Sequence, residues 1–587
     1  MAYRWVLNRK RRAWLACCAA LGVGLMLAPR MSVAAEAAAP NFGPNVVVFN
    51  QSMPSSSMQA RIDKIYAAEQ HSEFGKGRYA ILFMPGHYHL DVPIGFYTEV
   101  MGLGRSPDAV EIDGNVHSDA TLPHDNATCT FWRGIAGISV LPAGGTMQWA
   151  VSQAAPFRRM HIRGNMVLNQ NHGWASGGWM ADSLVDGQVD SGTQQQWISR
   201  NSEWGSWTGS NWNMVFVGVP NMPAGDWPNP PYTKVARTPV IREKPFLEVD
   251  DKGRWSVRVP SLERQSEGIS WRSGETPGHS IPLNRFYIAQ AGTDTAASIN
   301  AALSAGKNVL LTPGIYELTG AIRVTRPDTM LLGLGFATLK PVDGTAAVET
   351  ADEDGIEIAG LLIDAGPVKS PVLVQIGPEG SKRSHESNPI CLHDVFFRVG
   401  GAGVGKAGIN LLVNSSDTMI DHTWIWRADH GNGVGWQSNV SANGLVVNGD
   451  RVTAYGLFVE HHQEFQVLWN GEDGRTYFYQ SEIPYDPPNQ PSYTSAPRVD
   501  GWASYKVSDN VKRHEAWGLG VYSVFYKPNV VLSRAIEVPQ TPGVRFHHMI
   551  TVALGRLGGI LNVIDNTGGP TSIRPRVTPK VAEFPPN

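Results

Sequence analysis

The sequence has little cysteine and little charge. Of its four cysteines, Cys17 and Cys18 lie in an apolar leader, while Cys129 and Cys391 are far apart and lack metal-ligand spacing. One disulfide between them and two buried free thiols both remain open. Charged residues make up 17% of the chain, below the roughly 25% of typical soluble proteins, whereas glycine is abundant at 62 residues. This composition favours a large β protein with many turns over a helical bundle.

The apolar run near the N-terminus is too short to span a membrane. "LACCAALGVGLMLA" has 14 residues, and a spanning helix needs about 20. The run follows the basic segment "MAYRWVLNRKRRAW" and precedes the small-residue segment "SVAAEAAA", which is the order of a secretory signal. We therefore expect residues 1–35 to be a signal peptide cleaved after Ala35 or Ala37, and the mature protein to be secreted without a membrane anchor.

The mature chain is expected to be acidic. The signal contains six of the 49 basic residues and none of the 52 acidic ones, which leaves 43 basic residues against 52 acidic ones and a net charge of −9. A protein with this balance has no general attraction for nucleic acid or for polyanionic substrates. A chain of 587 residues is also too long for one ordinary core, so two or more structural units are expected.

Two segments repeat one pattern. "YAILFMPGHYHLDVPIGFYTEVMGLG" (79–104) and "KNVLLTPGIYELTGAIRVTRPDTMLLGLG" (307–335) each contain a strand, a Pro-Gly turn, a tyrosine, a second strand and Gly-Leu-Gly. Each follows a helix-like stretch, 57–70 and 295–306, and the duplication implies two similar units. Such a start is typical of right-handed parallel β-helices, whose first helix covers the open end of the core. A β-sandwich would also give many short strands, but it does not explain the repeated start.

The fold prediction is therefore all-β, with two tandem right-handed parallel β-helices packed side by side. Short apolar runs separated by Gly, Asn or Asp follow each start, and each coil of such a solenoid takes roughly 20–25 residues. We expect residues 36–225 to form the first helix and residues 284–587 the second. Residues 226–283 are rich in proline, contain a hairpin pattern around "DDKG", and are expected to cross from one helix to the other.

Glu460 and Glu482 are 22 residues apart, which is one coil. They should stack on adjacent strands, on the same face of the second helix. Two carboxylates so placed repel one another, which raises the pKa of one of them and keeps it protonated near neutral pH. One charged and one neutral carboxyl group is the arrangement that glycoside hydrolysis needs. The alternative is a pair of solvated surface glutamates, and the spacing alone leaves it open.

Four motifs in the second half carry a family resemblance. "WIWRADH" (424–430), "GLFVEHHQEFQ" (456–466), "QSEIPYDPPNQ" (480–490) and "EAWGLGVYSVF" (515–525) occur in this order. Together they resemble glycoside hydrolase family 55, the exo-acting β-1,3-glucanases. The resemblance implies two β-helices lying side by side, an active site in the cleft between them, and a neutral β-glucan polysaccharide or oligosaccharide as substrate.

The resemblance also implies roles for individual residues. Glu482 matches the general acid, and Glu460 matches the second carboxylate, which polarises water or tunes the acid. "SGTQQQWISRNS" (191–202) resembles the strand that holds the nucleophilic water, so Gln194 and Gln196 are the candidates for that role. The candidates for contact with the sugar are Trp426, Asp429, His461 and Tyr485.

The family inverts the anomeric centre, which requires carboxyl groups roughly 6.5–9.5 Å apart, whereas adjacent strands favour a shorter separation. Amides that help to hold the water would reconcile the two, because Glu460 then need not act alone as the base.

Two other functions remain open. A polysaccharide lyase would fit a β-helix, but the sequence shows no calcium-binding Asp cluster, and the net charge of −9 disfavours a polyanionic substrate. A non-catalytic glycan-binding solenoid would keep the aromatic residues without needing Glu482. "GLGRS" and "GVGKAG" are isolated glycine-rich turns without a nucleotide-binding context, so no cofactor and no metal are expected. We expect the protein to act as a monomer.

Overall fold

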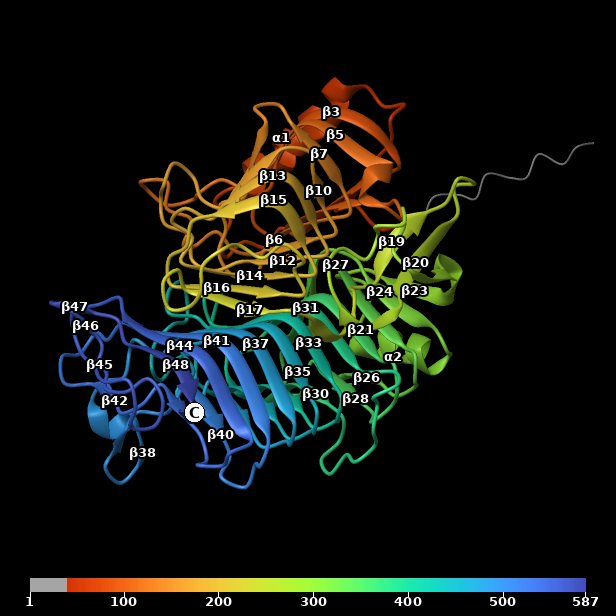
Figure 1. Ribbon diagram of the computed structural model, residues 1–587. Helices are drawn as coiled ribbons and strands as arrows, with labels where there is room; N and C mark the ends of the chain where they lie inside the picture. The colour runs from red at the N-terminus through yellow and green to blue at the C-terminus, as the bar shows by residue number, and fades with distance from the viewer. Residues whose placement is uncertain (1–39, 587) are drawn as a thin grey trace, which may run out of the picture. The chain divides into compact units, whose positions relative to one another are not determined.

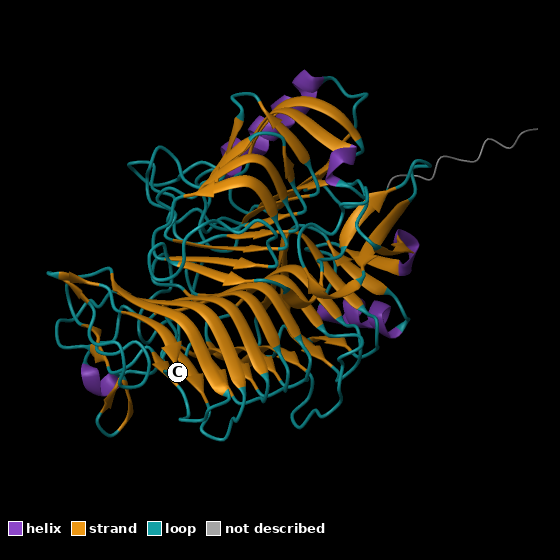
Figure 2. Ribbon diagram, viewed as in Figure 1, coloured by secondary structure: helices purple, strands orange, loops and turns teal. Residues whose placement is uncertain are grey.

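The structure, a computed structural model, describes residues 40–586, and its regular secondary structure is almost all strand, joined by many loops and turns (Figure 2). The predicted signal peptide, residues 1–35, lies outside the described residues. Two α-helices occur in the described part, α1 (Ser55–Glu69) and α2 (Ala296–Ser304). Neither of these helices is long and apolar enough to cross a membrane. The predicted all-β class is confirmed, and the large sheets are parallel.

The first unit contains two parallel sheets (Figure 1). One has the order β1 (Val46–Phe49), β2 (Tyr79–Phe83), β4 (Thr98–Gly102), β6 (Arg133–Ala136), β9 (Pro156–Arg158), β12 (Trp179–Ala181), β14 (Gln196–Arg200), β16 (Asn213–Val217) and β17 (Tyr232–Val235). The other has the order β3 (Gly86–Pro93), β5 (Val110–His117), β7 (Ser139–Pro142), β10 (His161–Ile162), β13 (Leu184–Asp190), β11 (Asn165–Val167) and β8 (Thr146–Gln148), with β15 (Glu203–Thr208) paired to β13.

The second unit repeats this arrangement with longer strands. Its main sheet has the order β23 (Phe286–Ala289), β24 (Asn308–Leu311), β27 (Met330–Pro341), β29 (Glu357–Asp364), β31 (Cys391–Val399), β33 (Met419–Arg427), β35 (Thr453–Glu460), β37 (Gly474–Glu482), β41 (His514–Ser523), β44 (Val544–Ala553) and an antiparallel last strand, β48 (Lys580–Phe584). β25 (Ile315–Leu318) pairs with β27. The second sheet is β26 (Ile322–Val324), β28 (Val348–Thr350), β30 (Ser370–Ile376), β32 (Ala407–Val413), β34 (Ser441–Val447), β36 (Val467–Trp469), β40 (Tyr505–Val507) and β43 (Ile536–Glu537).

The two predicted helices cover the ends of the two cores. α1 buries Met58, Ile62 and Ile65 in the core of the first unit. α2 buries Ile299 and Leu303 in the core of the second. The duplicated helix-then-strand start is therefore confirmed, and each helix shields apolar side chains that the first strands would otherwise leave exposed.

Antiparallel strands join the two units. β18 (Thr238–Arg242) pairs with β21 (Leu262–Ser266), and β20 (Trp255–Pro260) lies between β19 (Phe246–Val249) and β22 (Gly278–Pro282). The β19–β20 hairpin turns around the "DDKG" segment, as predicted. β17 still pairs with β16, so the first unit runs past the boundary expected at residue 225. The reason is that the proline-rich stretch returns to add one more parallel strand before it leaves the sheet.

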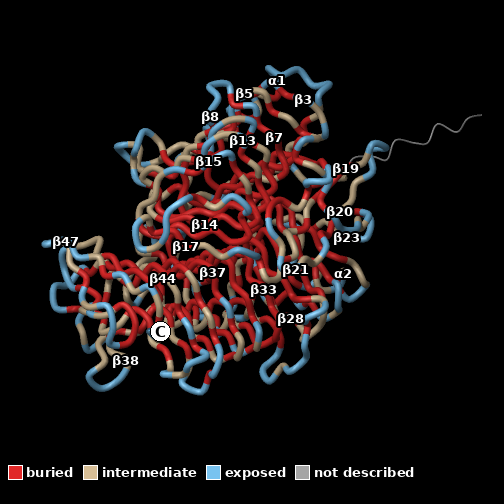
Figure 3. The backbone as a smooth tube through the Cα atoms, in the orientation of Figure 1, coloured by how far each residue is buried: buried red, intermediate tan, exposed pale blue. Residues whose placement is uncertain are grey.

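Alternation along the strands decides which residues face the first unit. In β35, Leu457 and Val459 point into the core of the second unit, whereas Phe458 belongs to a cluster shared by the two units. Figure 3 shows buried residues along β33 and β37 and also along β14 of the first unit. Because side chains alternate along a strand, Glu460 lies on the face of Phe458 and is directed toward the first unit.

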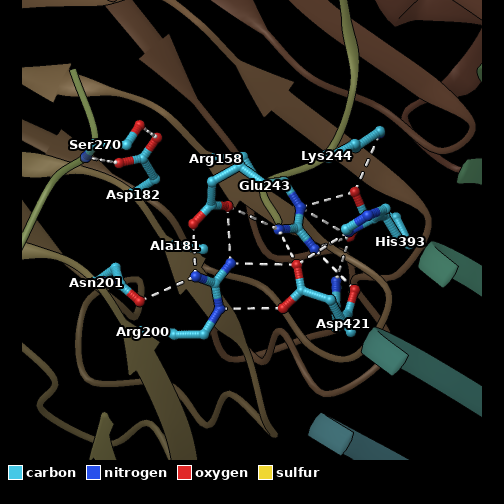
Figure 4. Close-up of polar contacts among 12 residues, drawn as sticks. Arg158, Ala181, Asp182, Arg200, Asn201, Glu243, Lys244, Ser270, His393 and Asp421 are labelled. Atoms are coloured by element: carbon cyan, nitrogen blue, oxygen red, sulfur yellow. Dashed lines mark hydrogen bonds and ion pairs between the residues drawn. The ribbon is translucent and has the colours of Figure 1, made fainter. Parts of the chain in front are cut away.

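A buried network of charges connects both units and the crossover (Figure 4). Arg158 donates to Asp421 Oδ2 (2.8 Å) and to both oxygens of Asp394, while Arg200 donates to Asp421 Oδ1 (3.1 Å). Arg200 also binds both oxygens of Glu243 in the crossover (2.6 and 2.8 Å). Although burial opposes ionisation, Arg158 and Arg200 hold the pKa of Asp421 well below its usual range. These paired charges therefore hold the two units in register, because separating them would leave buried charges without partners.

Candidate active site

One pocket is lined by residues of both units and contains the two glutamates that the sequence singled out. Its volume is about 260 Å³. The first unit contributes Thr128, Cys129, Phe131, Gln153, Ser176 and Gln195, and the second contributes Trp424, Trp426, Asp429, His430, Glu460, His461, Glu482, Tyr485 and Leu554. A pocket with several carboxyl groups of shifted pKa is the strongest candidate for a catalytic site.

Glu460 and Glu482 lie at the ends of adjacent parallel strands, β35 and β37. Phe458 pairs with Gln480, 22 residues later, and the amide of His461 donates to the carbonyl oxygen of Glu482 (2.8 Å). The spacing of one coil therefore stacks the two glutamates as predicted. Both side chains line the pocket.

Glu460 is buried and held at both carboxylate oxygens. Gln153 Nε2, from the first unit, donates to Oε1 (2.9 Å), and Trp424 Nε1 donates to Oε2 (2.8 Å). Burial raises the pKa of Glu460 to about 7, although the hydrogen bonds from Trp424 and Gln153 favour its charged form. With both oxygens accepting, Glu460 is arranged to carry a negative charge.

Glu482 is also removed from water but lacks such donors among the described residues. The pKa of Glu482 is raised well above its usual range. Burial is the largest cause, and the negative charges of Glu460 and Asp429 add to it. The residues that the structure describes donate no hydrogen bond to its carboxyl group, so nothing compensates an anion there. Burial raises both pKa values, but hydrogen bonds favour the anion only at Glu460. This difference marks Glu482 as the protonated acid and Glu460 as the base.

The four candidate sugar contacts, Trp426, Asp429, His461 and Tyr485, all line the pocket. Trp426, however, is less exposed to solvent than a sugar contact is expected to be. Its ring is almost fully buried and stacks on Trp424 (4.8 Å between ring centroids) and on Phe74 (6.3 Å). Tyr485 meets His461 edge to face at 4.4 Å. Trp426 therefore forms the packed back of the wall, and Tyr485 forms a more exposed part of it.

Asp429 lies between two histidines. Its Oδ1 is 2.9 Å from His430 Nδ1 and 3.8 Å from His461 Nε2. Although burial opposes ionisation, the hydrogen bond with His430 and the charge of His461 hold the pKa of Asp429 below its usual value. Burial likewise opposes the charging of His430, but hydrogen bonds to Asp429, Cys129 and Glu73 raise its pKa to about 12. Asp429 thus presents a fixed carboxylate, suited to accept hydrogen bonds from sugar hydroxyls.

The structure does not bring Gln194 and Gln196 into the pocket. Gln194 lies in a turn, where its Oε1 accepts from the amide of Gly177 (2.8 Å) and its Nε2 donates to the carbonyl of Val151 (3.2 Å). Gln196 is the buried first residue of β14. The expectation treated both as alternate positions of one strand, but the strand begins only at Gln196. Gln195, between them, is the residue that lines the pocket.

Sequence reasoning missed Gln153, Ser176 and Trp424. Gln153, Ser176 and Gln195 are 23 and 19 residues apart, about one coil in each step, so the coil period that linked the glutamates also links these residues. Cys129 and Cys391 are free thiols, which decides between the two states that the sequence left open.

Comparisons with known proteins identify the family of this chain. Residues 286–482 match the LAM55 pectate lyase-like domain. The chain is 46% identical over 548 residues to an exo-β-1,3-glucanase of Streptomyces sp. (strain SirexAA-E / ActE), across 93% of this chain and 90% of the relative. The solved structure of sacteLam55A from Streptomyces sp. SirexAA-E matches with a TM-score of 0.91 at 46% identity, across 93% of this chain and 99% of that one. The chain belongs to glycoside hydrolase family 55.

A second solved structure shows what a family 55 protein can hold. It is a glutamate-to-alanine variant of sacteLam55A in complex with glucose, and it matches this chain with a TM-score of 0.91 at 45% identity, across 93% of this chain and 99% of that one. The family 55 resemblance that the motifs carried is thereby confirmed. The motif residues Glu460 and Glu482 share one pocket with Trp426, Asp429, His461 and Tyr485.

Proposed function

We propose that the protein is an exo-acting, inverting hydrolase of β-1,3-glucan. The observation that carries this proposal is the pair Glu460 and Glu482, stacked in a pocket formed by both units, with hydrogen-bond donors at the carboxyl group of Glu460 and none from the described residues at that of Glu482. The relative named an exo-β-1,3-glucanase, and the glucose complex of sacteLam55A, support the same substrate class.

Glu482 acts as the general acid. Its raised pKa keeps the carboxyl group protonated near neutral pH, and it gives this proton to the glycosidic oxygen as the bond to the leaving sugar breaks. The oxygen then departs as a neutral hydroxyl group. Glu482 becomes an anion and regains its proton from water afterwards.

Glu460 acts on the water that attacks the anomeric carbon. Gln153 and Trp424 donate to its two oxygens, which favours the charged form and fixes the orientation of the carboxylate that takes a proton from the water. Ser176 and Gln195 line the same pocket from the first unit. We assign Gln153, Ser176 and Gln195 the water-positioning role that the family resemblance implied for Gln194 and Gln196.

A pocket of about 260 Å³ is slightly smaller than the roughly 300–1,000 Å³ of most ligand sites, which suits one terminal sugar better than an internal stretch of polymer. Tyr526 is 54% exposed and meets Tyr485 at 5.7 Å between ring centroids. An exposed aromatic ring beside the pocket gives the departing chain an apolar face to stack on. The proposed action is therefore removal of single glucose units from a chain end.

We also infer that the two pairs of parallel sheets are right-handed parallel β-helices, packed side by side. Parallel pairing between successive coils, a helix over one end of each core, and the charge network between the units support this inference. Secretion through residues 1–35 and action as a monomer complete the proposal. Both are inferred from the sequence, and neither is needed for the chemistry.

Digestion of laminarin tests this proposal. Purified protein should release glucose from the start of the reaction, without an early pool of longer oligosaccharides. Unsaturated products that absorb in the ultraviolet would indicate a lyase instead. Binding without any released sugar would indicate a non-catalytic glycan-binding protein.

A further inference from the structure

Three side chains in and behind the wall of this pocket could together bind a metal ion. Glu73, Cys129 and His430 each offer one ligand atom, and the three atoms lie within 4.8 Å of one another. Glu73 follows α1 and Cys129 lies between β5 and β6, both in the first unit, whereas His430 follows β33 in the second. Because 56 and 301 residues separate them, no sequence spacing could indicate a metal site, and none was expected.

The three donor types and their separations suit zinc. Zinc binds carboxylate oxygen and imidazole nitrogen at about 2.1 Å and thiolate sulfur at about 2.3 Å, so donors in a tetrahedral site are about 3.4 Å apart. Glu73 Oε1 and His430 Nε2 are 2.7 Å apart and would move apart by less than about 1 Å to admit an ion. The site then has three protein ligands and one open position.

Neighbouring groups already orient these ligands. His430 Nδ1 is 2.9 Å from Asp429 Oδ1, which is the carboxylate contact that commonly orients a metal-bound imidazole through its other nitrogen. The hydroxyl group of Tyr97 donates to the backbone carbonyl of Glu73 (2.5 Å). The ring of Phe74 meets the His430 ring edge to face (5.6 Å). The ligands are thus held from both units before any ion binds.

A buried trio of the same composition provides a contrast. The ligand atoms of Glu357, Cys391 and His393 also lie within 4.8 Å of one another. In that trio, Arg242 already donates to Glu357 Oε1 (2.9 Å), and His393 is held between Glu357 and Asp421. Its members are fully buried and already paired with a cation. Glu73, Cys129 and His430 are each partly exposed, so of the two trios this one is accessible to an ion, and its cation, His430, is itself a ligand that can lose its proton to solvent.

We propose that Glu73, Cys129 and His430 bind zinc, and that the bound ion inhibits hydrolysis. On binding, the thiol of Cys129 and the imidazolium of His430 each lose one proton to the solvent. Cys129 and His430 line the pocket together with Glu460 and Glu482, so an ion on them occupies space that the sugar needs. The inhibition rests on the proposed function, whereas the site itself does not.

Cobalt(II), a spectroscopic substitute for zinc, tests the site without any assay of activity. Titration of the full chain should produce a thiolate-to-cobalt charge-transfer band that zinc then abolishes. The band should be lost in Cys129→Ser and kept in Cys391→Ser, the matched control from the buried trio. All three proteins share Cys17 and Cys18, so any contribution from those thiols cancels. Glu73→Gln should weaken cobalt affinity by at least the roughly 10–100-fold that follows loss of a supporting partner.

Each outcome decides one part of the proposal. A band that persists in Cys129→Ser, or that disappears in Cys391→Ser, overturns the assigned site. A cobalt affinity unchanged in Glu73→Gln removes Glu73 from it. Zinc that displaces cobalt but leaves laminarin hydrolysis unchanged overturns the inhibition and leaves the site standing. Failure of the metal-free protein to hydrolyse laminarin contradicts the proposed function, while the cobalt spectrum still decides the site.

Discussion

The hydrogen bond from Gln153 to Glu460 predicts a shift in the pH dependence of catalysis. Gln153→Leu removes the amide that donates to Glu460 Oε1 at 2.9 Å and leaves a side chain of similar size. In the proposed mechanism Glu460 must be ionised, so its pKa sets the low-pH side of the pH–rate profile. The amide stabilises the anion, and its removal therefore raises that pKa.

The size of the shift follows from the strength of the contact. A hydrogen bond to a charged group contributes about 1.5–3 kcal/mol, and one pKa unit corresponds to about 1.36 kcal/mol. The pKa of Glu460, about 7 in the parent protein, should therefore rise by about 1–2 units. Well below this pKa, kcat/KM should fall about 10–100-fold, and the loss should shrink as the pH rises.

Steady-state kinetics on laminari-oligosaccharides across a range of pH measure this shift. Trp424→Phe removes the donor to the other oxygen of Glu460 (2.8 Å) and should move the same limb in the same direction. Gln195→Leu is the control, because Gln195 lines the pocket without a hydrogen bond to Glu460. A Gln153→Leu enzyme that loses the same factor at every pH would refute the reasoning and place Gln153 on the substrate.

Three further predictions follow from the same geometry. Glu482→Gln should lower laminarin hydrolysis by roughly 10²–10⁴-fold, the usual share of general acid catalysis, while oligosaccharide binding measured by calorimetry persists. Arg427→Lys loses the two-point contact with Asp486 (2.9 and 2.8 Å) that fixes the loop carrying Tyr485. The KM should rise several-fold in steady-state assays with little change in kcat. Arg158→Ala removes the buried cation shared by Asp394 and Asp421 and should destabilise the fold by about 3–5 kcal/mol, seen as a lower urea midpoint.

Each of these predictions has a control. An aryl glucoside with a good leaving group, if accepted, should lose less activity than laminarin in Glu482→Gln, and an equal loss would count against proton donation. A fall in kcat without a rise in KM would remove Arg427 from substrate positioning. Arg237→Ala breaks an exposed ion pair with Glu267 and should cost about 1 kcal/mol or less. A similar cost for Arg158→Ala would mean that the buried network contributes little.

Local patterns in the sequence were enough to predict much of the fold. The duplicated Pro-Gly start and the helix before it depend on short stretches, and both recur in the structure as α1 and α2 with their first strands. The separation of Glu460 and Glu482 could be interpreted because parallel coils repeat at a nearly constant length. The motifs then placed the glutamates and the candidate sugar contacts in one pocket.

Features that depend on contacts between the units could not be predicted. Gln153 meets Glu460 across 307 residues, and Arg158 meets Asp421 across 263, and no local pattern encodes either pairing. The assignment of Gln194 and Gln196 failed for a different reason, because the face of a side chain depends on where β14 begins. A shift of one residue at the start of a strand exchanges the two faces.

Proton NMR of the first glucose released from laminarin tests the central claim most directly. The claim is that Glu482 donates a proton while Glu460 directs water to the opposite face of the anomeric carbon. This mechanism predicts α-glucose as the first product, followed by slow conversion to the equilibrium mixture of anomers. Initial release of β-glucose would contradict the claim, because it would require a covalent intermediate on a carboxylate in place of an attacking water.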